Sequence, residues 1–247
     1  MVQLPTLAPA CAVFANTKEK VYPNGQHKVT VCSRVIFKAD KYMEPVQDTE
    51  PQAKPKDMSN EVRADSVKRA KERIFDIAMC NEFDYFITWT LDAGQIDRYD
   101  PAQVSAKLKK FLNNRVQRND ARYVVIPEHH KDGAIHMHGL LSGNFKMVDS
   151  GHKTDAGQAI YNMPQWKLGW STAIQLDEQK ERVSRYITKY VTKEFKKIFG
   201  AFYYAGGHGL VRQPPVRVYD TDYEAFDLPE YGPEGIPVKF KYFTAEE

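Results

Sequence analysis

The chain has 247 residues, of which 42% are hydrophobic, enough to bury a full core and to form one sizeable domain with appendages. Its three cysteines, Cys11, Cys32 and Cys80, form no Cys-x-x-Cys pair, so neither a disulfide framework nor a cysteine zinc site is indicated. The first residues lack a basic start, and no run of about eighteen apolar residues occurs, which argues against secretion and membrane spanning and favours the cytoplasm.

The net charge of +3 is unevenly distributed. Residues 220–247 hold eight acidic and two basic side chains, which leaves 33 basic and 24 acidic ones in residues 1–219. A basic body suits a polyanionic partner such as nucleic acid, although many metabolic enzymes are equally basic. We expect residues 220–247 to be an acidic C-terminal tail that stays away from such a partner.

Residues 1–57 are expected to form an N-terminal extension. An Asn24-Gly25 turn signal precedes an alternating segment at 28–37, which is typical of a strand hairpin. From Glu44 onward the chain is polar and contains several prolines, so a loose linker should follow. The main domain should then span residues 58–219.

Within that domain the first element should be a helix. Apolar residues from Ser59 to Cys80 recur at helical spacing, with Ser59 or Asn60 as the cap. Residues 83–91 are rich in aromatic and β-branched side chains and predict a strand. Asp100, followed by Pro101, should cap a second helix that runs to Arg118 and carries five cations and no carboxylate.

The remaining elements should be three strands and a last helix. We expect strands at 122–129, 135–141 and 170–176, an irregular stretch at 142–167, and a helix at 177–199. A helix, strand, helix order with a hairpin in the middle predicts an α+β fold, an antiparallel sheet with helices packed on one face.

The strand at 135–141 reads Ile-His-Met-His-Gly-Leu-Leu. Because strand side chains alternate between faces, His136 and His138 share one face with Cα atoms about 7 Å apart, near enough to reach one ion. Glu128 on the preceding strand is the candidate third ligand. A three-residue loop at 131–133 would set Glu128 opposite His136, whereas a two-residue loop would turn it to the other face.

Both loops are compatible with the sequence, and Pro127 predicts an edge contact or a bulge beside Glu128. Two imidazoles and a carboxylate would suit Mg²⁺ or Mn²⁺ with phosphate oxygens, and also Zn²⁺ or Fe²⁺. The purely structural alternative is that the two histidines are incidental and hydrogen-bonded to backbone. The sequence therefore predicts a metal site without naming its metal.

The helix at 177–199 carries two tyrosines one turn apart. At about 100° per residue its apolar side chains form one stripe, while Tyr186 and Tyr190 lie outside it among cations. Lys189 and Lys193 each follow a tyrosine by three residues and could favour a phenolate nucleophile. The simpler alternative is an amphipathic helix whose tyrosines border the core, which fits Tyr190 better than Tyr186.

Taken together, these motifs resemble those of the HUH endonuclease superfamily, in particular rolling-circle replication initiators of single-stranded DNA phages of the two-tyrosine, microvirus-like type. The resemblance rests on three motifs in order, Phe86-Ile87-Thr88-Trp89-Thr90, Ile135-His136-Met137-His138 with Glu128, and Tyr186-x-x-Lys189-Tyr190-x-x-Lys193. It implies a ferredoxin-like or RRM-like fold with the histidines on central strands. No Gly-Lys dipeptide occurs, so no Walker A loop is present.

The resemblance further implies a function. A tyrosine would nick single-stranded or hairpin origin DNA with help from Mg²⁺ or Mn²⁺, leaving a 5′-phosphotyrosine and a free 3′-OH that starts rolling-circle replication. A host helicase and polymerase in the cytoplasm of a bacterial cell would be partners. Lysines of the helix at 101–118 could hold phosphates, and Trp89, Tyr85 or Trp170 could stack on bases.

Three other functions fit parts of the pattern. A relaxase or single-strand transposase would use the same chemistry on another DNA. A non-catalytic RRM-like module would bind nucleic acid without a covalent product. A two-histidine, one-carboxylate oxygenase is disfavoured because no further ligand follows His138 at suitable spacing.

Overall fold

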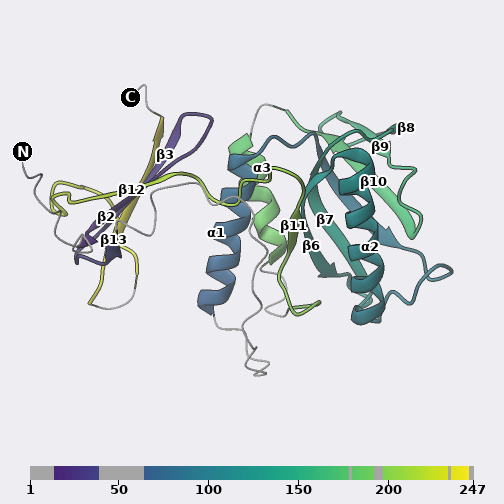
Figure 1. Cartoon of the computed structure of the whole chain (residues 1–247), viewed down its shortest axis with the longest axis horizontal. Helices are drawn as coiled ribbons and strands as arrows, with labels where there is room; N and C mark the ends of the chain where they lie inside the picture. The colour runs from purple at the N-terminus through teal and green to yellow at the C-terminus, as the bar shows by residue number, and fades with distance from the viewer. Residues whose placement is uncertain (1–13, 39–63, 178–179, 192–196, 233–234, 245–247) are drawn as a thin grey trace, which may run out of the picture. The chain divides into compact units, whose positions relative to one another are not determined.

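The computed structural model describes residues 14–38, 64–177, 180–191, 197–232 and 235–244. The chain forms two compact units: described residues 64–212 make a central unit, and residues 14–38 with 213–244 make a terminal unit (Figure 1). The predicted linker and the predicted helix caps Ser59 and Asn60 lie outside the described residues. None of the helices in the described ranges is long and apolar enough to cross a membrane.

The terminal unit joins segments from both ends of the sequence. Its four-stranded antiparallel sheet has the order β12-β2-β3-β13, from β2 (Thr17–Val21), β3 (Gln26–Cys32), β12 (Val216–Tyr219) and β13 (Val238–Thr244). The short strands β1 (Phe14–Ala15) and β4 (Phe37–Lys38) pair separately. Gly25, with φ of +80°, lies in the predicted turn, now between β2 and β3. Residues 220–247, expected as a tail, thus contribute a strand.

The central unit is a seven-stranded sheet with helices. All its printed strand pairs are antiparallel, in the order β11-β6-β7-β5-β10-β9-β8. Its elements in chain order are α1 (Ala64–Cys80), β5 (Tyr85–Leu91), α2 (Pro101–Asn119), β6 (Arg122–His129), β7 (Ile135–Ser142), β8 (Val148–Lys153), β9 (Ala159–Asn162), β10 (Gly169–Gln175), α3 (Lys180–Ile187), a 3-10 turn (Thr188–Val191) and β11 (Tyr204–Gly206). The predicted α+β fold with an antiparallel sheet is confirmed.

The helices cover both faces of the sheet, which corrects the expectation that they share one face. On one face α2 buries Val104, Leu108 and Leu112 in a core with Trp89 and Met137. On the other, α1 and α3 pack over Val124, Ile126 and Leu140 of β6 and β7. Figure 1 shows the sheet between α2 and the α1–α3 pair. A side chain on β7 therefore faces one of two different layers, according to its parity.

The cap of the second helix follows the sequence closely. The Asp100 carboxylate accepts hydrogen bonds from the backbone N–H groups of Ala102, at 2.8 Å, and Gln103, at 3.2 Å, and Pro101 occupies the first turn. These bonds satisfy two of the amide groups that the helix leaves without intrahelical partners. The predicted start of α2 is thus confirmed.

Two segments differ from expectation. The stretch at 142–167 contains β8 and β9, and β8 is almost fully exposed, so it lacks the apolar alternation that marks a half-buried strand. The last helix is shorter than predicted: α3 ends at Ile187 and continues as a 3-10 turn to Val191, and residues 197–200 are not helical. The Thr188 hydroxyl donates to the Arg185 carbonyl at 2.7 Å, a local bond that competes with regular helix.

Candidate metal centre and tyrosine pair

The hairpin between β6 and β7 has the three-residue loop that sets Glu128 opposite His136. The His130 N–H donates to the Ala134 carbonyl at 2.7 Å, closing residues 131–133, and Gly133 has φ of +85°. Glycine reaches this left-handed conformation without steric cost. The register continues through Pro127, which pairs with Met137 without the bulge that the proline suggested.

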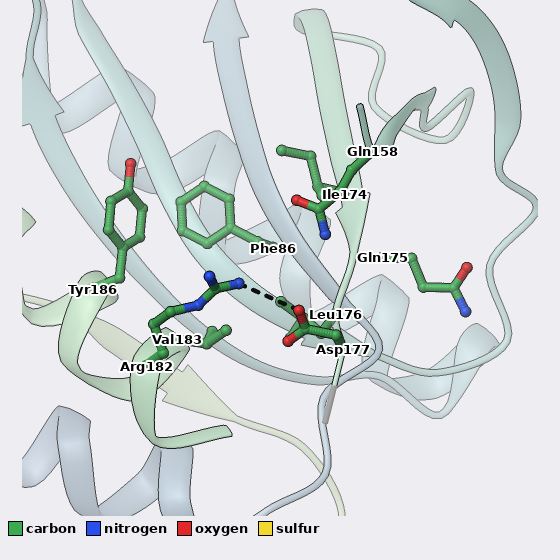
Figure 2. A pocket seen from close by; sticks show the side chains of 9 residues that line it. All are labelled: Phe86, Gln158, Ile174, Gln175, Leu176, Asp177, Arg182, Val183 and Tyr186. Carbon is green, nitrogen blue, oxygen red and sulfur yellow. Dashed lines mark hydrogen bonds and ion pairs between the residues drawn. The ribbon is translucent and has the colours of Figure 1, made fainter. Parts of the chain in front are cut away.

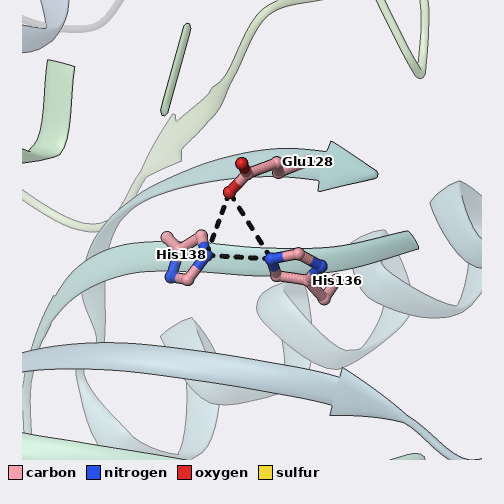
Figure 3. A group of neighbouring side chains, drawn as sticks. All are labelled: Glu128, His136 and His138. Atoms are coloured by element: carbon pink, nitrogen blue, oxygen red, sulfur yellow. Dashed lines mark hydrogen bonds and ion pairs between the residues drawn. The ribbon is translucent and has the colours of Figure 1, made fainter. Parts of the chain in front are cut away.

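The two histidines and the glutamate converge on one point (Figure 3). The Nε2 atoms of His136 and His138 lie 2.9 Å apart, and the Oε2 atom of Glu128 lies 3.4 Å and 3.1 Å from them. Glu128 is 5% exposed, and both imidazoles are half-buried. A buried carboxylate is costly unless cations or hydrogen bonds compensate its charge. This Glu-His-His triad could hold a metal ion.

The donor set fits a divalent ion. Its three edges, between 2.9 Å and 3.4 Å, resemble the separations between ligands that are bonded to one metal at about 2.0 to 2.2 Å. The geometry of the three atoms does not distinguish among Mg²⁺, Mn²⁺, Zn²⁺ and Fe²⁺. His130, a neighbour of the triad, is 65% exposed and pairs with Asp132 at 3.4 Å, so it lies outside the ligand group.

Neighbouring strands hold the triad in place. On β5 the hydroxyl of Thr88 lies 3.0 Å from Nδ1 of His138, a contact that orients the imidazole with Nε2 towards Glu128. Gly139 follows His138, and a Cβ atom there would lie 2.6 Å from the carbonyl oxygen of Val124. The glycine therefore allows β6 and β7 to approach closely beside the ligands. Sequence reasoning had missed Thr88, whose place is visible only once β5 and β7 are paired.

Both tyrosines border the triad. The ring of Tyr190 stacks on the imidazole of His138 with centroids 3.8 Å apart, and its hydroxyl donates to that of Tyr186 at 2.8 Å. Phe86 contacts both phenol rings, at 5.5 Å and 6.1 Å between centroids. Tyr186 is 44% exposed, whereas Tyr190 is half-buried and packs on the core beneath α1 and α3. Two phenols and three ligating side chains thus share one face of the sheet.

The surroundings of Tyr190 keep its phenol protonated. Burial is the main cause that raises the pKa of Tyr190, followed by its hydrogen bond to Tyr186 and the negative charges of Tyr186 and Glu128. The ammonium of Lys189 lies over the ring of Tyr186, 5.2 Å from its centroid. Lys193 lies outside the described residues.

The aromatic residues suggested as base contacts separate into different environments. Trp89 is fully buried and stacks on Trp166 at 4.8 Å in the core beneath α2, so it is excluded as a base contact. Tyr85 is half-buried and packs against that same core. Trp170 on β10 is 64% exposed. The lysines of α2 also lie on the face away from the triad, because α2 packs on the opposite side of the sheet.

A cavity of about 340 Å³ opens beside Tyr186 (Figure 2). Its floor is apolar, with Phe86 and Ile174 from paired positions of β5 and β10. Its rim carries an ion pair of 3.2 Å between Arg182 and Asp177. The other residues that line it are Gln158, Gln175, Leu176 and Val183. Figure 2 shows the Tyr186 ring next to that of Phe86 at the edge of this space.

Comparison with known proteins gives one family. No curated protein and no solved structure matches the chain. Residues 84–195 match the family model of the replication-associated protein ORF2. The matched segment includes the triad and both tyrosines, and it supports a replication initiator of the Rep type that binds DNA.

Proposed function

We propose that this protein nicks and rejoins single-stranded DNA at a replication origin and thereby starts rolling-circle replication. The observation that carries the proposal is the stacking of Tyr190 on His138, with Tyr186 hydrogen-bonded to Tyr190. A phenol nucleophile and a set of metal ligands on one face are the parts that metal-assisted phosphodiester cleavage requires.

In the proposed step a phenol oxygen attacks the scissile phosphorus. A new bond forms between tyrosine and phosphorus, the bond from phosphorus to the 3′ oxygen breaks, and the phenol proton is exchanged for one on the departing 3′ oxygen. The products are a 5′-phosphotyrosine and a free 3′-OH, so attack by a 3′-OH on the phosphotyrosine rejoins the strand. A divalent ion held by Glu128, His136 and His138 would polarise the phosphate.

The chain's own side chains would divide the work. Tyr186 is the exposed phenol, and its oxygen accepts a hydrogen bond from Tyr190, which disperses the negative charge of a phenolate. Lys189 adds a cation at 5.2 Å from the ring centroid of Tyr186. We propose that Lys193 acts in the same way, as its spacing from Tyr190 suggests, and that Tyr190 cuts once a full circle has been copied.

The two-tyrosine arrangement supports an initiator of the phage type, acting in the cytoplasm of a bacterial cell. An initiator without a Walker A loop would depend on a host helicase for unwinding, and a host polymerase would extend the 3′-OH. The relaxase and transposase alternatives share the step and differ only in the DNA that they cut.

The test is covalent capture. The full chain, incubated with Mn²⁺ and a labelled pool of single-stranded oligonucleotides of randomised sequence, should give an adduct that survives SDS. The Tyr186→Phe, Tyr190→Phe double variant is the control and should give none. If the adduct survives in that variant, the nucleophiles are assigned incorrectly. If DNA is retained without any adduct and without need for a metal, the protein is a binding module.

A further inference from the structure

The pairing of four strands defines what surrounds the triad on its face of the sheet. Directly paired residues point to the same side, so Glu128, His136, Thr90 and Trp170 form one row across β6, β7, β5 and β10. The next row on that face holds Ile126, His138, Thr88 and Thr172, and the row beyond it holds Val124, Leu140, Phe86 and Ile174.

The part of these rows on β5 and β10 is open. Thr90 and Thr172 are exposed, Thr88 is half-buried, and Trp170 is 64% exposed. Exposure of a large indole forgoes the stabilisation of about 2 kcal/mol that burial of such a side chain gives, so its position calls for a partner. We name Thr88, Thr90, Trp170 and Thr172 the open β5–β10 face.

This face runs between two places where a planar group can bind. At one end is the indole of Trp170, two strands from His136 and therefore about 10 Å from it between Cα atoms. At the other end is the cavity floored by Phe86 and Ile174, which lies four residues, or about 13 Å, further along β10. Stacked bases rise about 3.4 Å each, so one base cannot reach both ends.

We propose that the open β5–β10 face holds single-stranded DNA, with one base stacked on Trp170 and another base of the same strand inserted in the cavity beside Tyr186. The proposal rests on the proposed function for its substrate, the strand that is to be cut. It adds the residues that position this strand and read its bases.

The chemistry of the face favours this occupant. Among the eight side chains in the two rows that contain the histidines, the one carboxylate is buried Glu128, so no exposed carboxylate there repels a phosphate. Threonine hydroxyls can donate to phosphate oxygens and accept from bases. An exposed aromatic ring on a sheet is a stacking surface for unpaired bases, which a duplex does not present.

The cavity fits a base better than a larger group. Its volume of about 340 Å³ is at the low end of the roughly 300 to 1,000 Å³ of small-molecule sites. It combines the ring of Phe86 with polar groups at its rim, the carboxamide of Gln158 and the ion pair of Arg182 with Asp177. Such groups can bond the edge of a base whose plane lies on the apolar floor.

Tryptophan fluorescence tests the first contact without cleavage. The experiment uses the full chain in EDTA and short oligothymidines and oligoadenines. Of the three tryptophans, Trp89 and Trp166 are buried, so quenching by the oligonucleotide should come from Trp170. Trp170→Ala should abolish the quenching and weaken binding about fivefold or more, while Trp170→Phe should keep most of the affinity. Tyr99→Ala removes another exposed ring, 52% exposed, and should change neither.

The second contact is tested by filling the cavity. Ile174→Phe keeps a residue suited to a strand and occupies the floor, and Gln158→Ala removes the rim carboxamide. Both should weaken binding of these oligonucleotides, and the loss should add to that of Trp170→Ala, since the two sites lie far apart. Gln117→Ala, an exposed glutamine of α2, is the matched control. Unchanged affinity in Trp170→Ala, or in both cavity variants, would overturn the proposal.

The outcome is separable from that of the proposed function. Binding in EDTA reports on the face whether or not any adduct forms with Mn²⁺. An adduct that forms equally well in wild type, Trp170→Ala and Ile174→Phe at limiting DNA would support nicking and reject this path for the strand. Quenching and affinity loss as described, with no adduct under any condition, would retain the path and reject nicking.

Discussion

The hydroxyl of Tyr190 donates a hydrogen bond of 2.8 Å to the hydroxyl of Tyr186. The donor is the half-buried phenol whose pKa is raised, mainly by burial, and the acceptor is the exposed one. The pair is therefore asymmetric: one phenol keeps its proton, and the other has an oxygen that is open to a substrate. Two tyrosines one turn apart in sequence are thus unequal in structure.

This asymmetry predicts unequal variants. Tyr186→Phe should reduce the first covalent adduct below about one-hundredth of wild type, because the attacking oxygen is lost. Tyr190→Phe should keep the first adduct at a reduced rate, since only a hydrogen bond to the nucleophile is removed. Denaturing gels of single-turnover reactions measure both rates. The opposite ranking would make Tyr190 the first nucleophile.

Metal binding should stabilise the central unit. At about 100 times its dissociation constant, Mn²⁺ should add about 2.7 kcal/mol to the free energy of unfolding and raise the melting temperature by roughly 5 to 10 °C. The shift should disappear in His138→Ala and shrink as the pH falls, because protonated imidazoles do not ligate. His152→Ala, on exposed β8, is the matched control. An unchanged shift in His138→Ala would place the ion elsewhere.

Gly139→Ala should damage the site through the backbone. The added methyl would lie 2.6 Å from the carbonyl oxygen of Val124, so β6 and β7 must separate next to His138 and Glu128. We expect a loss of about 1 to 3 kcal/mol in unfolding free energy together with weaker metal binding. Urea denaturation and metal titration measure these effects. Gly94→Ala, whose methyl would have no contact closer than 3.5 Å, should be nearly neutral in both measurements.

The cations of α2 should affect affinity and leave the chemical step unchanged. Lys107 and Lys110 are exposed on the helix that covers the other face of the sheet from the triad. Changing both to glutamine should lower the salt dependence of binding to long single strands by about 1.4 in log–log slope, if both contact phosphates. The rate of adduct formation with saturating short oligonucleotides should stay at the wild-type value. A large fall in that rate would show that α2 contributes to the reaction.

Removal of residues 213–247 should do more than delete negative charge. The deletion takes away β12 and β13, which are the two outer strands of the terminal sheet and pair with β2 and β3. Residues 14–38 would then keep too few strands for a stable unit, while the central sheet loses none. Limited proteolysis should therefore cut the N-terminal segment quickly and leave a resistant core. Equal resistance of the N-terminal segment in both proteins would contradict this.

Local chemistry made several elements predictable. The Asp100-Pro101 cap and the Lys131-Asp132-Gly133 loop each have a turn chemistry that fixes backbone geometry within a few residues. The loop then determined the register, and with it the convergence of Glu128 with both histidines. Alternation along β7 was sufficient to assign the histidines to one face.

What could not be predicted depends on contacts distant in sequence. Strand β13 pairs with β3 about 200 residues away, and its lysines and neighbouring carboxylates made the segment resemble a solvated tail. Trp89 and Trp170 have similar strand contexts, and only the pairing of β5 with β10 assigns one to the core and the other to the open face. The end of α3 was missed because Thr188 bonds back to the helix, a competition that periodicity does not register.

The arrangement of the terminal sheet has a consequence for synthesis on the ribosome. Strands β2 and β3 emerge early, but their partners β12 and β13 follow only after the whole of residues 64–212. Translation at about 5 to 20 residues per second therefore leaves this early hairpin without its flanking strands for several seconds or more. The central unit can complete its own sheet in that interval, so the terminal sheet closes last and marks a fully translated polypeptide.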